Sequence, residues 1–553
     1  MAANIKILEL SRQMTILGLA LTSLIITPSI SFEPFNSPKF LISTNLAVVL
    51  LFLLLTSINV KSYIRVNPKL LILSVAFIIQ AVITLFNHKN GTINQLFGVD
   101  GRNTGFILYV SLLIILMSVS ILTNPKFIKS LAITLILVGL LSSFYGLIQL
   151  IGLDPINWNN QFNRVIGFFG NPNFQSAFMG ITGAAVFGII FGGKLSLTHR
   201  FILIALLMLL TVVIIFSQSQ QGVLILISGF FVSSYIAISK ISRYSKASKY
   251  YGFSILLIMV FIGLDILQKS PWGSLLYKQS VSNRGDLWRA AWRMAKDNPI
   301  SGVGFDGYDN YYRAYRDEVA ITSRGVSTTS NSSHNVLLDL LSSGGFVLLA
   351  IYIGVLILVF ISAIKVIRRE NNYNPYFTSI FAAWVAYQFQ SLISINQIGL
   401  AIWGWALSGA IIGYERWSSG ATEAVMLESS KWPFLNFIKI AIGLVAGFSI
   451  GVIPMRADVA FRSALDSRQI ELVLASGYQW PQSPQRMLQV ANLFKQNSLF
   501  DLSAQVAREA TIKFPRYYEN WELLSTLEGV SVEEKQNALS KMRALDPLNP
   551  DLK

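Results

Sequence analysis

The sequence predicts an all-α membrane protein with a soluble helical tail. Of its 553 residues, 53% are hydrophobic and 13% are charged, and the mean hydropathy is +0.54. Soluble domains rarely combine such values. The apolar residues also gather in runs close to the ~20 residues that a helix needs to cross a bilayer. We therefore expect a polytopic bundle of about twelve or thirteen transmembrane helices over residues 1–454 and a soluble α-helical domain over 455–553.

The apolar runs follow one another along the chain. The first, from about Met14 to Ser31, could be a secretory signal, but no small-x-small cleavage site precedes soluble sequence, so we interpret it as an uncleaved first helix. The others lie at about 40–58, 69–86, 105–122, 127–152, 173–193, 201–216, 222–239, 251–267, 336–364, 376–395, 399–414 and 437–454.

Lysine and arginine are unevenly distributed between these runs. Alternate connections are basic, such as the one at 240–249, which holds Lys240, Arg243, Lys246 and Lys249. By the positive-inside rule these connections and the N-terminus are cytoplasmic. The loop at 268–335 and the domain at 455–553 then lie outside the cytoplasm. Because topology accounts for the net charge of +16, we predict no nucleic-acid partner.

The loop at 268–335 has local structure of its own. A helix is expected from Asp286 to Asp297, where apolar residues recur at helical spacing and Pro299 ends it. Gly302 and Gly304 follow and predict a tight turn at which the backbone can approach a ligand.

A second helix is expected from Asp306 to Glu318. Tyrosines recur on it at i, i+3, i+4 and i+7, so they share a face: Tyr308, Tyr311, Tyr312 and Tyr315. Flat, amphipathic rings of this kind can stack on sugars. An aromatic belt at the membrane interface would use the same residues, and both interpretations stay open.

Three arginines are predicted at the outer face. Arg102 and Arg164 each lie shortly before an apolar run among Gly and Asn residues, and Arg284 begins the outer loop. A cation beside a membrane helix is costly and therefore a functional candidate. Guanidinium groups bind pyrophosphate in bidentate form, whereas a single arginine can also reach lipid headgroups. The three together favour a pyrophosphate site.

His334 is the candidate proton acceptor among three histidines. It stands directly before Asn335 at the start of an apolar helix, and imidazole accepts and releases protons near neutral pH. A helix-capping or headgroup role is the alternative. His199 is expected on the cytoplasmic side and His88 in a solvated loop. No second histidine or carboxylate cluster has ligand spacing, so we predict no metal and no other cofactor.

Four motifs stand out in the sequence. They are Arg284-x-x-x-Trp288 with Asn298-Pro299-x-x-Gly302-x-Gly304, His334-Asn335 and Gly345; Phe169-Gly170-Asn171-Pro172-Asn173; Gly98-x-x-x-Arg102-x-x-Gly105; and Ser217-Gln218-Ser219-Gln220-Gln221-Gly222. Together they resemble the O-antigen ligase and O-antigen polymerase superfamily of bacterial membrane glycosyltransferases. In the fourth motif, the family commonly has an arginine where Gln220 or Gln221 stands here.

The resemblance implies a GT-C-like, metal-independent and inverting glycosyltransferase of cell-envelope polysaccharide biosynthesis. It would use an undecaprenyl-pyrophosphate-linked glycan and a lipid, glycan or protein acceptor, among the lipids of the bacterial cytoplasmic (inner) membrane. Carried over by position, His334 would be the base and Arg102, Arg164 and Arg284 would hold the pyrophosphate. Residues in supporting roles would be Asn171, Asn173, Gly302, Gly304 and Asn335.

Several functions share these features. A ligase and a polymerase have the same motifs, so the sequence does not separate them. A lipid or anion transporter also uses basic residues among many helices, but transporters are often built from internal repeats, and we find no convincing one. After Met455, helical pairs recur at a spacing near the ~34 residues of tetratricopeptide repeats, which predicts a docking surface for a protein partner.

Overall fold

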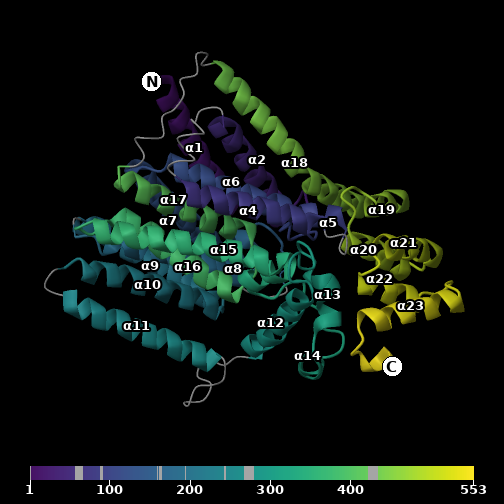
Figure 1. The fold of residues 1–553 in the computed structure, drawn as a ribbon. Helices are drawn as coiled ribbons and strands as arrows, with labels where there is room; N and C mark the ends of the chain where they lie inside the picture. Colours follow the sequence, from purple (N-terminus) through teal and green to yellow (C-terminus); the bar gives the residue numbers. More distant parts are fainter. Residues whose placement is uncertain are drawn as a thin grey trace.

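The computed structural model describes residues 2–55, 67–86, 91–158, 160, 165–193, 195–241, 245–266, 279–420 and 434–552. All regular structure in these ranges is helical (Figure 1), which confirms the predicted all-α class. Each predicted apolar run overlaps one long helix: α1 (Ala2–Leu24), α2 (Asn36–Leu55), α4 (Pro68–Leu85), α6 (Phe106–Leu122), α7 (Pro125–Leu150), α8 (Pro172–Ile190), α9 (Leu197–Phe216), α10 (Gln220–Ser239), α11 (Ser245–Ile266), α15 (Val336–Arg369), α16 (Pro375–Ile393), α17 (Ile398–Ser418) and α18 (Phe434–Ser467).

The long helices form a polytopic membrane bundle. Within the described ranges, nine of them are long and apolar enough to cross a bilayer, and α6 is apolar with 17 residues. Nearly all of α17 is buried, whereas α9 leaves most of its apolar side chains exposed. A helix that is apolar all round belongs either in the centre of a bundle or against lipid. Hence α17 lies inside the bundle and α9 at its lipid-facing surface.

Local sequence signals begin several of these helices. Asn124, Asn171 and Asn374 each stand directly before a proline, and each side-chain oxygen accepts a hydrogen bond from a backbone N–H of the first turn. Asparagine is a favoured N-cap, and proline suits the first helical position because its missing N–H would have no intrahelical partner. The Asn-Pro pairs therefore fix where α7, α8 and α16 start.

Three helices, two of them short, lie between α11 and α15 at one end of the bundle. They are α12 (Gln279–Asp297), α13 (Tyr308–Tyr315) and α14 (Glu318–Arg324). The sequence predicted one helix from Asp306 to Glu318, but the chain breaks there because Asp317 caps α14, accepting a hydrogen bond from the Ala320 N–H at 2.9 Å. At the same end, α5 (Thr92–Phe97) precedes α6 and the 3-10 helix η2 (Gly167–Phe169) precedes α8.

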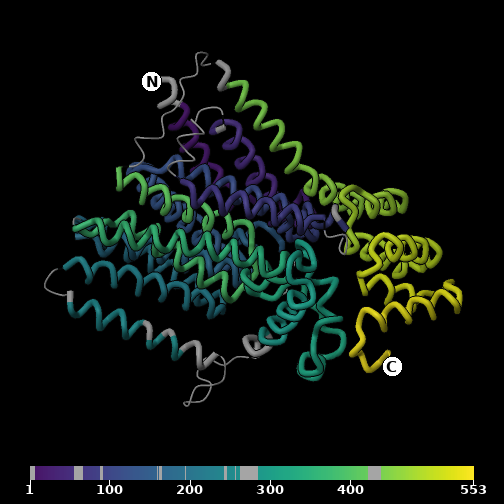
Figure 2. The backbone as a smooth tube through the Cα atoms, viewed as in Figure 1, coloured from purple at the N-terminus to yellow at the C-terminus, as the bar shows by residue number. Residues whose placement is uncertain are grey.

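The C-terminal helices lie beyond that end of the bundle (Figure 2). α18 continues through Pro454 to Ser467, so the first helix of the tail is continuous with the last long apolar helix, and the predicted boundary at 455 falls inside it. α20 packs on α21 and α22 on α23 around a separate hydrophobic core, as the predicted helical pairs require. Their identity as tetratricopeptide repeats stays a prediction. The helices are α19 (Ile470–Gly477), α20 (Pro484–Gln496), α21 (Phe500–Lys513), α22 (Tyr518–Thr526) and α23 (Val532–Leu545).

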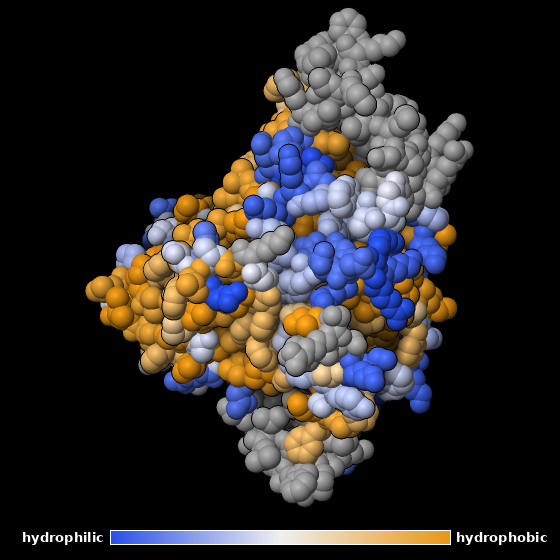
Figure 3. Space-filling model, turned by 90° about the vertical axis from the view of Figure 1, so that its left-hand side faces the viewer, coloured by the Kyte–Doolittle hydropathy of each residue, from blue (hydrophilic) through white to orange (hydrophobic). Residues whose placement is uncertain are grey.

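The opposite end of the bundle is rich in cations. Figure 3 looks onto that end and shows hydrophilic residues gathered between broad hydrophobic areas. Lys126 and Lys129 lie exposed in the first turns of α7, and Lys365, Arg368 and Arg369 lie exposed at the end of α15. The bundle thus has a basic end and an end that carries the short helices and the tail.

Candidate active site

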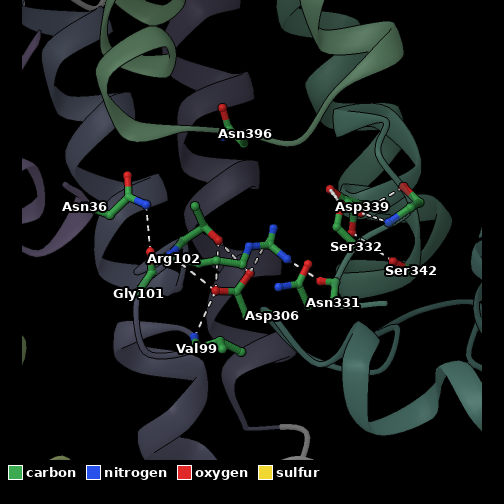
Figure 4. Close-up of polar contacts among 12 residues, drawn as sticks. Asn36, Val99, Gly101, Arg102, Asp306, Asn331, Ser332, Asp339, Ser342 and Asn396 are labelled. Atoms are coloured by element: carbon green, nitrogen blue, oxygen red, sulfur yellow. Dashed lines mark hydrogen bonds and ion pairs between the residues drawn. The ribbon is translucent and has the colours of Figure 1, made fainter. Parts of the chain in front are cut away.

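Arg102 links the loop between α5 and α6 to the loop that carries α13 (Figure 4). Its Nη2 lies 3.7 Å from Asp306 Oδ1, and its Nη1 donates a hydrogen bond to the carbonyl of Asn331. Asp306 also accepts hydrogen bonds from the Val99 N–H at 3.1 Å and the Thr104 hydroxyl at 2.6 Å. The guanidinium is thereby held where these two distant segments meet.

Gly98 explains how Asp306 comes so close. Its φ is +83°, and a Cβ at this position would lie 2.4 Å from Asp306 Oδ2. A side chain could therefore not be accommodated without moving the carboxylate, and the left-handed φ also favours glycine. This gives a physical reason for the first glycine of the Gly98-x-x-x-Arg102 motif.

His334 is fixed directly before α15. Its φ is +55°, a conformation that non-glycine residues adopt infrequently. The His334 N–H donates to Ser332 Oγ at 3.0 Å, and Ser332 Oγ in turn donates to Asp339 Oδ2 at 2.7 Å. Asn335 caps α15, accepting hydrogen bonds from the N–H groups of Leu337 and Leu338. The imidazole therefore projects from a turn that is held on both sides.

Three guanidinium groups act on this imidazole. Burial and the positive charges of Arg284, Arg102 and Arg324 lower the pKa of His334 from 6.5 to about 4. Both effects disfavour the imidazolium, so His334 is neutral at physiological pH. The structure thus brings together His334, Arg102 and Arg284, which lie far apart in the sequence.

Arg284 differs from the other two arginines in its contacts. It lies on α12, and burial lowers the pKa of its guanidinium. Among the residues that the structure describes, it makes no hydrogen bond or ion pair. A partly buried guanidinium without a counter-charge is a candidate ligand for an anion.

Sequence patterns did not single out Arg324. It ends α14, its side chain is 11% exposed, and its Nε lies 3.4 Å from Asp286 Oδ2. It belongs to none of the four motifs, so its place beside His334 becomes visible only from the coordinates. Its pairing with Asp286 makes it a supporting charge for the site rather than a free anion ligand.

The comparison with protein families covers the stretch that carries most of these residues. Residues 175–353 match the family model described as O-Antigen ligase. This stretch of the chain is therefore similar to the O-antigen ligase family. The matched stretch runs from α8 into α15 and contains Arg284 and His334, whereas Arg102 precedes it. No curated protein sequence matches the chain.

The second motif lies just before the matched stretch, and Arg164 falls outside the described residues. Asn171 caps α8, accepting a hydrogen bond from the Asn173 N–H at 2.9 Å, and the Asn173 side chain is exposed. Just before this motif, the N–H groups of Ile166 and Gly167 donate hydrogen bonds to Gln149 Oε1 on α7. The visible role of Asn171 is therefore to begin α8.

Gly302 and Gly304 face a helix instead of an open ligand site. Both have positive φ, +60° and +98°, and a Cβ on Gly302 would lie 2.3 Å from the Ser343 backbone. The N–H groups of Val303 and Gly304 donate to the carbonyls of Ser342 and Ser343 at 2.8 and 3.0 Å. We predicted a close approach to a ligand, but the close approach is to α15, because this turn packs on it.

The four tyrosines lie within the matched stretch and pack against α12. Tyr308, Tyr311 and Tyr312 are at most 3% exposed and share a hydrophobic core with α12, while Tyr315 is partly buried beside them. The Tyr308 hydroxyl donates to the Leu287 carbonyl at 2.7 Å. Rings enclosed in this way have little free face for a sugar, so we leave these tyrosines out of the proposed site.

Metal ligands are not gathered in this region. Within the described ranges, no group of three or more His, Cys, Asp or Glu side chains could hold a metal ion. The expectation of a metal-independent reaction stays a prediction and is tested below.

Proposed function

We propose that this protein transfers a glycan from an undecaprenyl-pyrophosphate carrier to an acceptor hydroxyl at the outer face of the bacterial cytoplasmic (inner) membrane. The observation that supports this most is the placement of the buried His334 imidazole among three guanidinium groups, in a membrane bundle whose residues 175–353 match the O-antigen ligase family model. An imidazole can take a proton and guanidinium groups can hold a diphosphate, which are the two needs of this reaction.

Arg284 and Arg102 bind the diphosphate in this proposal. Arg284 has no counter-charge among the described residues, and the ion pair of Arg102 with Asp306 is long, at 3.7 Å. Negative charge on the diphosphate grows as the bond to the anomeric carbon breaks. Fixed cations in a site with little water therefore stabilise the transition state more than the ground state. Arg164 is assigned to the same role by its motif position alone.

His334 removes the proton of the acceptor hydroxyl. As the acceptor oxygen attacks the anomeric carbon, its proton moves to an imidazole nitrogen and the diphosphate leaves with the electron pair of the broken C–O bond. Attack from the face opposite the diphosphate inverts the anomeric centre. The bound diphosphate also offsets the arginine charges, which raises the proton affinity of His334 when the donor is present. The base is thus strengthened by the substrate that needs it.

The orientation proposed here follows the charge distribution. The exposed cations at the ends of α7 and α15 support placing that end in the cytoplasm. His334 and the C-terminal helices, at the other end, then lie outside. Transport is less well supported, because the candidate groups lie at one end of the bundle and transporter sites lie near its middle. A polymerase would use the same site with a growing glycan as acceptor.

A reconstituted reaction tests the proposal. The purified protein is placed in proteoliposomes with a labelled undecaprenyl-pyrophosphate-linked glycan, and an envelope extract from cells lacking the gene supplies acceptors. Release of undecaprenyl pyrophosphate should require the protein and should fall by at least about a hundredfold in His334→Ala, in keeping with loss of a general base. The matched control is His199→Ala, because His199 lies exposed in the first turn of α9. Equal release by wild type and His334→Ala would refute the proposed chemistry.

A further inference from the structure

The C-terminal helices contact the segment that leads to His334 through a buried charge cluster. Arg316 Nη2 lies 2.5 Å from Asp546 Oδ2, and the two side chains are 1% and 0% exposed. Arg313 Nη1 lies 3.4 Å from the same oxygen, and its Nη2 lies 3.1 Å from Glu519 Oε1. Both arginines are at α13, while Glu519 lies on α22 and Asp546 directly follows α23. Charges buried to this degree persist only when paired.

The same two arginines also support the backbone before His334. Arg316 Nη1 donates to the carbonyls of Val326 at 2.7 Å and Thr328 at 3.1 Å. Arg313 Nη2 donates to the Ser327 carbonyl at 3.4 Å. Arg316 therefore holds the 326–328 backbone with one nitrogen and Asp546 with the other, while Arg313 Nη2 contacts both Ser327 and Glu519. The two arginines thus link that backbone to the carboxylates of the tail.

The supported segment continues directly into the site. After Thr328 it reaches Asn331, whose carbonyl accepts a hydrogen bond from Arg102. It then reaches Ser333, whose N–H donates to Asp339 at 2.7 Å, and ends at His334. Arginines at its start and Asp339 at its end thus fix the segment 326–334, which we call the His334 segment.

A second contact joins the tail to the loop of Arg102. Arg486 Nη2, on α20, lies 2.8 Å from Asp100 Oδ2, and Asp100 stands close before Arg102 in the same loop. Figure 1 shows the same arrangement, with α5 and α13 both beside the C-terminal helices. The tail therefore contacts the loop of Arg102 as well as the two arginines that hold the His334 segment.

We propose that the C-terminal helices are a positioning part of the transfer site, in which Asp546 acts through Arg316 to fix the His334 segment. This inference rests on the proposed function for its catalytic consequence. Without the Asp546 charge, Arg316 would lose its counter-charge and Arg313 would keep only Glu519, so Arg316 could not stay in this buried geometry. The forks would then leave the carbonyls of 326–328, and the imidazole would lose its fixed position relative to Arg102 and Arg284.

The test compares Asp546→Asn with Asp466→Asn in the full chain. Asp466 is a matched control because it lies on the same tail and pairs with Arg462 at the surface, where its side chain is 59% exposed. Amide hydrogen exchange is measured in detergent without donor or acceptor. We expect exchange in the His334 segment to be about tenfold faster or more in Asp546→Asn, since its local opening becomes easier, and unchanged in Asp466→Asn.

Kinetics then separates positioning from general stability. In Asp546→Asn, kcat for transfer should fall about tenfold with little change in the donor KM, because the base is misplaced while Arg284 remains. A second variant, Arg316→Lys, keeps a positive charge but replaces the two-nitrogen fork that bridges Asp546 and the carbonyls with a single ammonium. It should show the same faster exchange, so the test does not depend on one variant folding well.

Two results would overturn the inference. One is unchanged exchange of the His334 segment in both Asp546→Asn and Arg316→Lys. The other is faster exchange with wild-type kcat. Because exchange is measured without substrates, its outcome does not depend on the proposed function. Failure of the proposed function would instead appear as normal transfer by His334→Ala.

Discussion

The pH dependence of transfer gives a sharp prediction for His334. Its imidazole has a pKa near 4 in place of 6.5 because of burial and three arginines. The difference between these two pKa values corresponds to roughly 3 kcal/mol between the two protonation states. The perturbation is a change from pH 7.5 to pH 5, and the quantity measured is kcat/KM. The pH dependence of kcat/KM reports the pKa values of groups in the free enzyme.

The magnitude follows from the two pKa values. With a pKa of about 4, roughly 90% of His334 is still neutral at pH 5, so kcat/KM should fall by less than about twofold. With an ordinary pKa of 6.5, only about 3% would be neutral, and kcat/KM would fall about thirtyfold. Initial rates in proteoliposomes at low donor concentration distinguish the two. Recovery of the rate on return to pH 7.5 excludes unfolding as the cause of any loss.

The substrate should change this dependence in a defined direction. A bound diphosphate offsets the positive charges around His334, so protonation becomes less unfavourable and the pKa rises. The acid limb of kcat, which reports the enzyme–substrate complex, should therefore lie at higher pH than that of kcat/KM. Replacing Arg284 by Gln removes one of the charges and should move the kcat/KM limb upward. An acid limb of kcat/KM between pH 6 and 7 in the wild-type protein would refute the reasoning.

Three further predictions concern the other groups. Arg284→Lys should lose at least about tenfold in kcat/KM, nearly as much as Arg284→Ala, because an ammonium cannot replace the planar guanidinium fork. Arg293→Lys on the same helix is the control. A normal rate in Arg284→Lys would show that a positive charge alone suffices. A chelator should leave transfer unchanged, and inhibition reversed by Mg²⁺ or Mn²⁺ would contradict a metal-independent reaction. Tyr308→Phe should lower the free energy of unfolding by about 1 kcal/mol, because the hydrogen bond to the Leu287 carbonyl is lost. The KM for the donor should not change. A raised KM would indicate that this tyrosine contacts the sugar.

The parts of the fold that could be predicted from the sequence are those set by local signals. Apolar runs of bilayer length located the long helices, and Asn335 before an apolar run identified both the start of α15 and the fixed position of His334. Counting cations between the runs predicted Arg102 and Arg284 at the same end, and in the structure the charges of both act on His334.

Other features depend on partners that no local pattern reveals. Asp306 meets Thr104, beside Arg102, across 202 positions of the chain, and Asp546 meets Arg316 across 230. The tyrosine spacing showed that α13 has one aromatic face, but not that α12 covers it. Helical periodicity reports which residues share a face, and only packing decides what that face contacts.

Direct titration of His334 tests the central claim, that guanidinium groups and this imidazole form one diphosphate site. The chain has three histidines, so His88→Gln with His199→Gln leaves His334 as the only imidazole for ¹⁵N NMR in nanodiscs. We predict a pKa near 4 for the protein alone and a higher one when undecaprenyl pyrophosphate is added, with a smaller increase for undecaprenyl monophosphate. A pKa near 6.5 that responds to neither lipid would contradict the account.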